Sequence, residues 1–125
     1  MDPSDDRILK WAADLASGLQ ARLGVIHAIS SSEFHLETRF PGTEIRRTLD
    51  DAHARISHVL GGSPMPEAEI RVEGGSVPEV VHSVVKDSQA DLLIIGRASN
   101  RGMMGRLRTL SYALIRESAC PVISI

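Results

Sequence analysis

The chain has 125 residues, of which 42% are apolar, a size and composition that fit one domain, residues 1–125, with a hydrophobic core. A formal net charge of −2 and an aromatic content of 3% argue against a nucleic-acid partner, because proteins that bind nucleic acid carry basic surfaces and stacking aromatic rings. Cys120 is the single cysteine, which excludes an internal disulfide, and no membrane-spanning apolar run or signal peptide is recognisable, so we expect a cytoplasmic protein without membrane contact.

The N-terminal segment predicts an amphipathic helix. Apolar residues recur at helical spacing from Ile8 to Leu19. Asp2 followed by Pro3 has the pattern of a helix N-cap with proline in the first turn. Trp11 occupies an apolar position of this helix, so we expect its indole in the core.

Downstream of this helix, short apolar runs alternate with amphipathic segments. Runs rich in β-branched residues are typical of strands, and helical spacing of apolar residues is typical of helices. Ser76 and Glu79 have the spacing of a capping box, which predicts that a helix begins there. The expected elements are a strand at 25–29, a loop at 30–42, a helix around 45–59, a strand at 68–72, a helix from Ser76, a strand at 91–96, a helix around 107–115 and a strand at 120–125.

This alternation indicates an α/β fold, a three-layer α/β/α arrangement with a parallel sheet joined by right-handed crossovers. One feature of the order is unusual. A doubly wound domain normally opens with a strand, whereas here the first helix begins almost at Met1.

The segment from Asp91 to Thr109 joins an apolar strand to a helix and is rich in glycine and arginine. In open α/β sheets, ligands bind beyond the carboxyl ends of the strands, where this segment is expected to lie. Glycine lets the backbone approach a ligand, a helix N-terminus offers free N–H groups, and guanidinium groups suit phosphate. A phosphate site is one interpretation, and a solvated loop with surface arginines is the other. The residues concerned are Gly96, Arg97, Arg101, Gly102, Gly105, Arg106 and Arg108.

The sequence resembles the universal stress protein family. The resemblance rests on "ADLLIIG" at 90–96, "LIRESACPVISI" at 114–125 and "GGSVPEVV" at 74–81, and it extends to residues 1–29. It implies a Rossmann-like fold of the adenine nucleotide alpha hydrolase type, with parallel strands in the order 3-2-1-4-5, and a homodimer. It also implies that ATP is a ligand of some members of the family and not of others.

ATP-binding members carry the pattern Gly-2x-Gly-9x-Gly-Ser/Thr in the loop after the fourth strand. Gly96 matches the first glycine, and Ser99 takes the place of the second. Arg108 and Thr109 take the places of the final pair, with the spacing one residue short. The arginine either blocks the approach of a ligand to the backbone or replaces the lost N–H contacts with its guanidinium group.

The resemblance also implies residues outside this loop. Asp2 matches an aspartate that contacts the nucleoside, with Ser4 completing the usual "D-x-S", and Ala28 falls where a backbone contact to adenine is usual. The candidate nucleotide-binding residues are therefore Asp2, Ala28, Gly96, Arg97, Ser99, Gly102, Gly105, Arg108 and Thr109.

The same resemblance implies a strand before the first helix, which the sequence does not contain. In the family this strand lies in the middle of the sheet, and its residues would precede Asp2. Three explanations are open: the protein starts further upstream, the two strands that flank the missing one close up, or another chain fills the space. We favour a truncated start as the origin.

Other reactive residue types have no pattern specific to a chemistry. The five histidines and one cysteine lack metal-ligand spacing, so we expect no metal site. His27, near the end of a strand, is interpreted as a hydrogen-bonded structural residue, and Cys120 as a structural thiol. No nucleophile, base and orienting group occur together, so we expect no catalytic residues, with weak nucleotide hydrolysis kept as a third hypothesis.

The last strand, from Pro121 to Ile125, is apolar and forms a sheet edge in the implied order. An exposed apolar edge invites pairing, so we expect a twofold homodimer through this strand. The leading hypothesis is a dimeric regulatory or binding protein for ATP, another adenine nucleotide or another phosphate-bearing ligand. The second is a dimeric interaction module of the stress response, with unknown protein partners, that binds no nucleotide.

Overall fold

The structure is a computed structural model that describes residues 3–29, 43–96 and 113–125. The expected helices and strands in these ranges are confirmed, and a short helical segment at 113–117 ends the expected last helix. The expected loop at 30–42 and the beginning of the last helix lie outside the described residues. The elements are α1 (Pro3–Leu19), β1 (Gly24–Ile29), α3 (Thr43–Gly61), β2 (Glu69–Gly74), α4 (Val77–Ser88), β3 (Leu93–Ile95) and β4 (Val122–Ser124).

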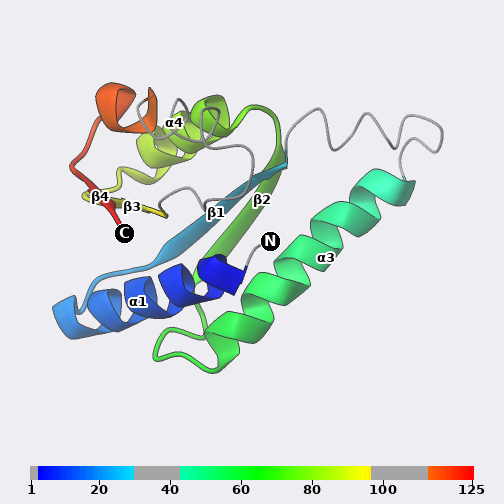
Figure 1. The fold of residues 1–125 in the computed structure, drawn as a ribbon, viewed down its shortest axis with the longest axis horizontal. Coiled ribbons are helices and arrows are strands. Elements are labelled where there is room, and N and C mark those ends of the chain that lie inside the picture. Colours follow the sequence, from blue (N-terminus) through cyan, green and yellow to red (C-terminus); the bar gives the residue numbers. More distant parts are fainter. Residues whose placement is uncertain (1–2, 30–42, 97–112) are drawn as a thin grey trace.

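All four described strands run parallel to their partners, and they pair two by two. β1 pairs with β2 over its whole length, from Gly24 opposite Glu69 to Ile29 opposite Gly74. β3 pairs with β4, with Ile94 opposite Ile123. The order across the molecule is β4, β3, β1, β2 (Figure 1), which is the implied family order with its first strand left out.

Within the described ranges, no ladder joins β1 to β3. The explanation that these two strands close up is therefore wrong for the described residues. One helix on each side spans both ladders. On one side, α1 packs near β1 and meets the end of β3 through Ile8. On the other side, α4 contacts β1 and lies over Leu93 of β3.

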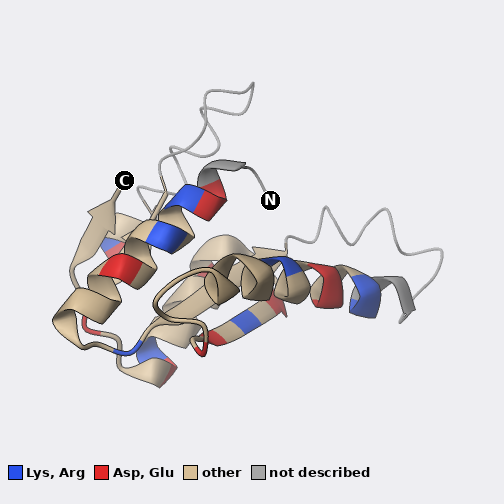
Figure 2. Cartoon of the chain, turned by 90° about the horizontal axis from the view of Figure 1, so that it is seen from below, with Lys and Arg blue, Asp and Glu red and all other residues tan. Residues whose placement is uncertain are grey.

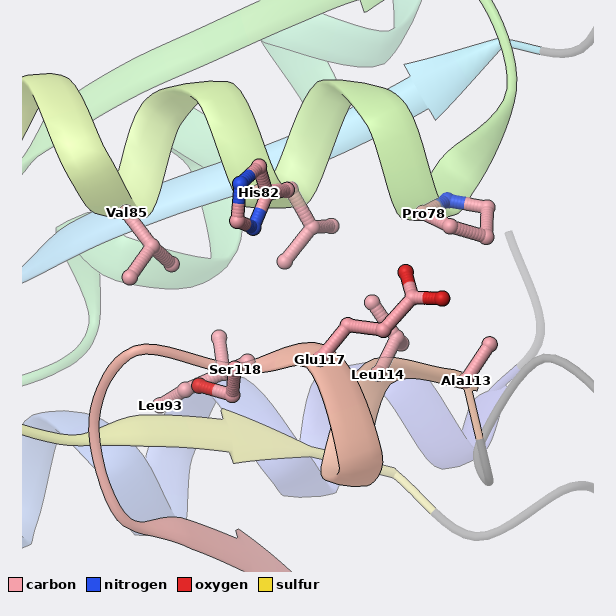
Figure 3. A pocket seen from close by; sticks show the side chains of 9 residues that line it. Pro78, His82, Val85, Leu93, Ala113, Leu114, Glu117 and Ser118 are labelled. Atoms are coloured by element: carbon pink, nitrogen blue, oxygen red, sulfur yellow. The ribbon is translucent and has the colours of Figure 1, made fainter.

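The main core lies between α1, α3 and the first ladder. Leu9 and Ala13 of α1 pack with Ile56 and Leu60 of α3, and Val25 of β1 is among the side chains that cover this cluster. The helix α4 lies on the other side of β1 (Figures 1 and 3) and buries a face of four valines, Val80, Val81, Val84 and Val85. Helices on both sides of parallel strands make this a doubly wound α/β arrangement.

The turn from β2 into α4 follows local rules. Gly75 has a φ of 141°, a conformation that side chains disfavour, and its N–H donates to the carbonyl oxygen of Ile29 at 3.0 Å. Ser76 is the N-cap of α4, and its Oγ accepts a hydrogen bond from the N–H of Glu79 at 3.4 Å. The predicted cap is therefore confirmed, and Pro78 occupies the first turn, where its missing N–H needs no partner.

Trp11 is not a core residue, which corrects the expectation from the sequence. Its side chain is 40% exposed, whereas Leu9, Ala13 and Ala16 on the same helix are buried. The buried stripe of α1 is made mostly of alanines, which let the helix backbone approach α3 closely. The indole lies on the flank of that stripe rather than within it.

Charged residues of both signs are interspersed along α1 and α3 (Figure 2). None of the helices in the described ranges is long and apolar enough to cross a membrane.

Candidate site at the carboxyl edge of the strands

The carboxyl ends of β1 and β3 are the place where the candidate site is expected. Two of its predicted residues are described. Ala28 is the last residue but one of β1, and Gly96 directly follows β3. The other predicted residues lie outside the described ranges, namely Asp2, Arg97, Ser99, Gly102, Gly105, Arg108 and Thr109.

Ala28 presents its backbone away from β2. The N–H of Glu69 donates to the carbonyl of Leu23 at 3.3 Å, and the N–H of Gly75 donates to the carbonyl of Ile29 at 3.0 Å. Successive residues of a strand point their N–H and C=O groups to opposite edges, so odd-numbered residues of β1 face β2. The N–H and C=O of Ala28 therefore face the edge toward β3.

Gly96 lies directly against α1. A Cβ at this position would collide with Cδ1 of Ile8, and it would lie 3.4 Å from Cγ1 of the same side chain. Only glycine therefore lets the first half of α1 rest on the end of β3 without a shift of Ile8. Reasoning from the sequence missed this contact, because the two residues are distant in the chain.

The first turn of α1 brings negative charge to this edge. Asp5 and Asp6 both lie in that turn, where carboxylates are favourable to the helix dipole. Oδ1 of Asp6 is buried without a hydrogen bond, and Nη2 of Arg55 lies 3.6 Å from it. This weak ion pair links α3 to α1. The acidic turn disfavours a phosphate at the start of α1, so cationic groups for an anion must come from elsewhere in the chain.

An apolar cleft separates α4 from the helical segment 113–117 (Figure 3). Val81, Val85, Leu93 and Leu114 are among its lining side chains. The carboxylate of Glu117 points from the helical segment toward α4 in Figure 3. The cleft runs along the face of α4, and His82 is the single basic side chain among its described lining residues.

A second, shallow groove lies between α3 and the outer part of β2, lined in part by Asp50, His53 and Glu73. Arg71 also lines it, and its Nε donates to Oε1 of Glu69 at 2.9 Å. The pKa of Arg71 is raised above its ordinary value, chiefly by this hydrogen bond and by the charge of Glu69. The groove mixes both charge signs and lies away from Gly96, so it is not part of the candidate site.

Two further predicted structural residues lie in the described ranges. His27 is half-buried within β1. Cys120 is also half-buried, and Oγ of Ser118 donates to its carbonyl oxygen at 2.8 Å in the turn that leads into β4. Among the described residues, no group of three or more histidine, cysteine or acidic side chains is arranged to hold a metal ion.

Parallel strands with helices on both sides define a doubly wound α/β protein. The profile of the "Universal stress protein family" matches residues 1–125. The chain belongs to that family, which confirms the resemblance inferred from the sequence.

Individual relatives are distant. Universal stress protein A homolog 1 of Coxiella burnetii is 19% identical over 129 residues, which span 100% of this chain and 90% of the relative. Universal stress protein D of Escherichia coli is 23% identical over 124 residues, which span 97% of this chain and 86% of the relative.

Solved structures share the fold. Universal stress protein UspA from Lactobacillus plantarum superposes with a TM-score of 0.72 at 17% identity, covering 100% of this chain and 92% of the other. A universal stress protein in complex with cAMP superposes with a TM-score of 0.66 at 21% identity, covering 99% of this chain and 88% of the other. At these identities the likeness is one of fold.

Proposed function

We propose that this protein is a regulatory or binding protein of the universal stress type that holds an adenine nucleotide, or another phosphate-bearing ligand, at the carboxyl edge between β1 and β3. The observation that carries the proposal is the pair formed by Ala28, whose backbone groups face away from β2 and toward β3, and Gly96, at the ends of neighbouring strands. Doubly wound sheets bind their ligands at this edge.

Each candidate residue has a role in this proposal. Ala28 offers its N–H and C=O to the edge of adenine, and Gly96 is assigned the approach of a ligand to the backbone beside the Ile8 side chain. Arg97 and Arg108 supply charge for phosphate, because guanidinium groups bind phosphate oxygens in pairs. The remaining roles are a ribose contact for Asp2, a hydroxyl contact for Thr109, and backbone approach at Ser99, Gly102 and Gly105.

The cAMP complex of a structural neighbour supports an adenine nucleotide as the first ligand to test. The proposed activity is binding in the cytoplasm, with no step of catalysis.

A dimeric interaction module is the second candidate function. The N–H of Leu93 donates to the carbonyl of Pro121, and the N–H of Ile125 donates to the carbonyl of Ile95, both at 3.0 Å. By the alternation of a strand, the backbone groups of Val122 and Ser124 face away from β3. This outer edge of β4 favours pairing between two copies through the residues from Pro121 to Ile125.

The test begins with the purified chain, heat-denatured, and mass spectrometry of any released nucleotide. Calorimetric titration with ATP, cAMP and inorganic phosphate follows, with the same chain extended upstream of Met1 as a second sample. We expect ATP or cAMP to bind and Arg108→Ala to weaken binding about tenfold, equivalent to about 1.4 kcal/mol.

Arg116→Ala is the matched control, since Arg116 is exposed on the helical segment 113–117 and has no role in the proposal. An unchanged affinity in the Arg108 variant contradicts the role of that residue. Failure of both samples to bind any of the three ligands contradicts the proposal and favours the interaction module.

A further inference from the structure

The strand β2 ends the order of strands across the molecule (Figure 1), and within the described residues β1 is its single ladder partner. The N–H of Glu69 donates to the carbonyl of Leu23 at 3.3 Å, directly before β1. The odd-numbered residues of β2 therefore face β1. We call the opposite edge, which carries the backbone groups of Ile70, Val72 and Gly74, the outer edge of β2.

The backbone groups on the outer edge of β2 have no hydrogen-bond partner in the part of the chain that the structure describes. Unpaired N–H and C=O groups of an edge strand pair with another extended segment, as in β-strand addition. The outer edge can therefore accept one more strand, and the side chains around it decide which kind of strand fits.

A groove with a volume of about 380 Å³ lies between α3 and the outer part of β2. Leu49 of α3 lines it together with Ile70 and Val72, and all three are half-buried. Ile70 and Val72 also pack against the main core, so the groove continues the core face of β2 outward. A strand added at the outer edge would direct every second side chain toward α3. Apolar side chains suit these positions.

The other face of β2 is charged. Successive side chains of a strand alternate between its faces, so Glu69, Arg71 and Glu73 share the face opposite to the core. Glu69 and Glu73 are exposed, and Arg71 donates from its Nε to Oε1 of Glu69 at 2.9 Å. An added strand would direct its remaining side chains to this face, beside these charges.

Negative charge predominates on this face. The pKa of Arg71 is raised by its hydrogen bond to Glu69 and by the charge of that residue, and further by the charges of Glu73 and of Asp87 in α4. One guanidinium group therefore lies among three carboxylates. Asp50, on the α3 side of the groove, forms no salt bridge with a described residue.

The two faces together select the occupant. Opposite charges on neighbouring strands stabilise their pairing, and like charges directly opposite each other destabilise it. We propose that the outer edge of β2 and the groove beside it bind an extended segment of a partner protein, with apolar and basic side chains in alternation, as an added strand. This surface lies away from Gly96, so the proposal does not depend on nucleotide binding.

Calorimetric titration with a defined peptide tests the proposal. The probe is acetyl-Val-Lys-Val-Lys-Val-Lys-Val-amide, and the same peptide with glutamate in place of lysine is the control for charge. Glu73→Gln removes one carboxylate from the exposed face of β2. Glu117→Gln is the matched control, because Glu117 is exposed on the helical segment 113–117 and lines the other cleft.

We expect the lysine peptide to bind at least about tenfold more tightly than the glutamate peptide. Glu73→Gln should weaken its binding about threefold, because one pair of opposite charges is lost, and Glu117→Gln should not. Hydrogen exchange of single amides, measured by NMR, locates the peptide. At saturation the N–H groups of Ile70 and Val72 should exchange at least about tenfold more slowly, whereas that of Arg71, which faces β1, is the internal control.

Several results overturn the proposal. If Ile70 and Val72 exchange as slowly as Arg71 in the free chain, the outer edge is already paired. Protection at Ser124 of β4 without protection at β2 assigns the peptide to another edge. Equal affinity for the two peptides contradicts the charge selection, and absence of binding at millimolar peptide contradicts the acceptor edge itself.

Discussion

The side chain of Ile8 fills the space that a Cβ at position 96 would occupy. This contact joins the first helix of the chain to the end of β3, and it gives Gly96 a packing role whether or not a ligand binds. Since the same glycine is a candidate for contact with phosphate, a single substitution there changes two properties together. The two roles are separated by changing Ile8 as well.

Gly96→Ala should reduce the free energy of unfolding by about 1 kcal/mol, because the end of the Ile8 side chain must move. The double variant Ile8→Ala/Gly96→Ala should be more stable than the sum of the two single effects predicts, since the smaller side chain removes the collision. Urea unfolding of all four forms measures this coupling. Additive effects contradict the packing role.

The same four forms test the ligand role of Gly96. If the approach of phosphate to the backbone requires a glycine, the double variant should bind ATP as weakly as Gly96→Ala does. Its stability should nevertheless be restored, because the collision with Ile8 is removed. Titration of Ile8→Ala alone is the control for changes that originate in α1. ATP affinity restored in the double variant would assign Gly96 to packing alone.

Leu60→Ala should lower the free energy of unfolding by about 3 kcal/mol, because Leu60 is fully buried in the core between α1 and α3. Leu19→Ala is the matched control: the same chemical change at a side chain that is 65% exposed should alter stability by less than about 0.5 kcal/mol. Chemical denaturation compares the two. Similar losses at both positions contradict the location of the core.

Ser76→Ala should lower the free energy of unfolding by about 1 kcal/mol, because the N–H of Glu79 loses the hydroxyl oxygen that caps α4. Ser83→Ala lies on the exposed face of the same helix and should be neutral or slightly stabilising, since alanine has the higher helix propensity. Thermal unfolding of the two variants measures the difference. A loss as large for the second substitution as for the first rules out a capping effect.

Ser124→Pro tests dimerisation through β4. The N–H of Ser124 faces away from β3, so its loss should leave the β3–β4 ladder in place while removing a donor from the outer edge. We expect the dimer dissociation constant, measured by sedimentation, to rise at least about tenfold, equivalent to about 1.4 kcal/mol. Ile123→Pro removes an N–H directed toward β3 and should destabilise the fold itself. An unchanged dimer in the Ser124 variant argues against this interface.

The candidate site could be predicted only in part. Its expected location after β3 followed from the alternation of elements, Gly96 was named from its place after that strand, and Ala28 was named from the family resemblance. The contact of Gly96 with Ile8 and the ion pair of Asp6 with Arg55 were not foreseen. Each joins residues on different elements, and no local pattern of apolar or charged residues encodes such a pairing.

Trp11 illustrates the same limit within one helix. Helical spacing identifies which residues share a face, and the face of Ile8, Trp11 and Leu19 is apolar. The choice of the face that is buried depends on what packs against it. The neighbouring stripe through Leu9 and Ala13 meets α3, so the indole stays 40% exposed.

The sequence by itself determined the order of helices and strands, the parallel α/β class, the cap at Ser76 and membership of the universal stress protein family. These properties depend on apolar periodicity and on short motifs, which act over a few residues. Only the tertiary structure decided that the strands form two separate ladders, with no ladder between β1 and β3 in the described residues. Strand pairing depends on backbone N–H and C=O groups, which every residue except proline carries alike, and on helices that bridge distant parts of the chain.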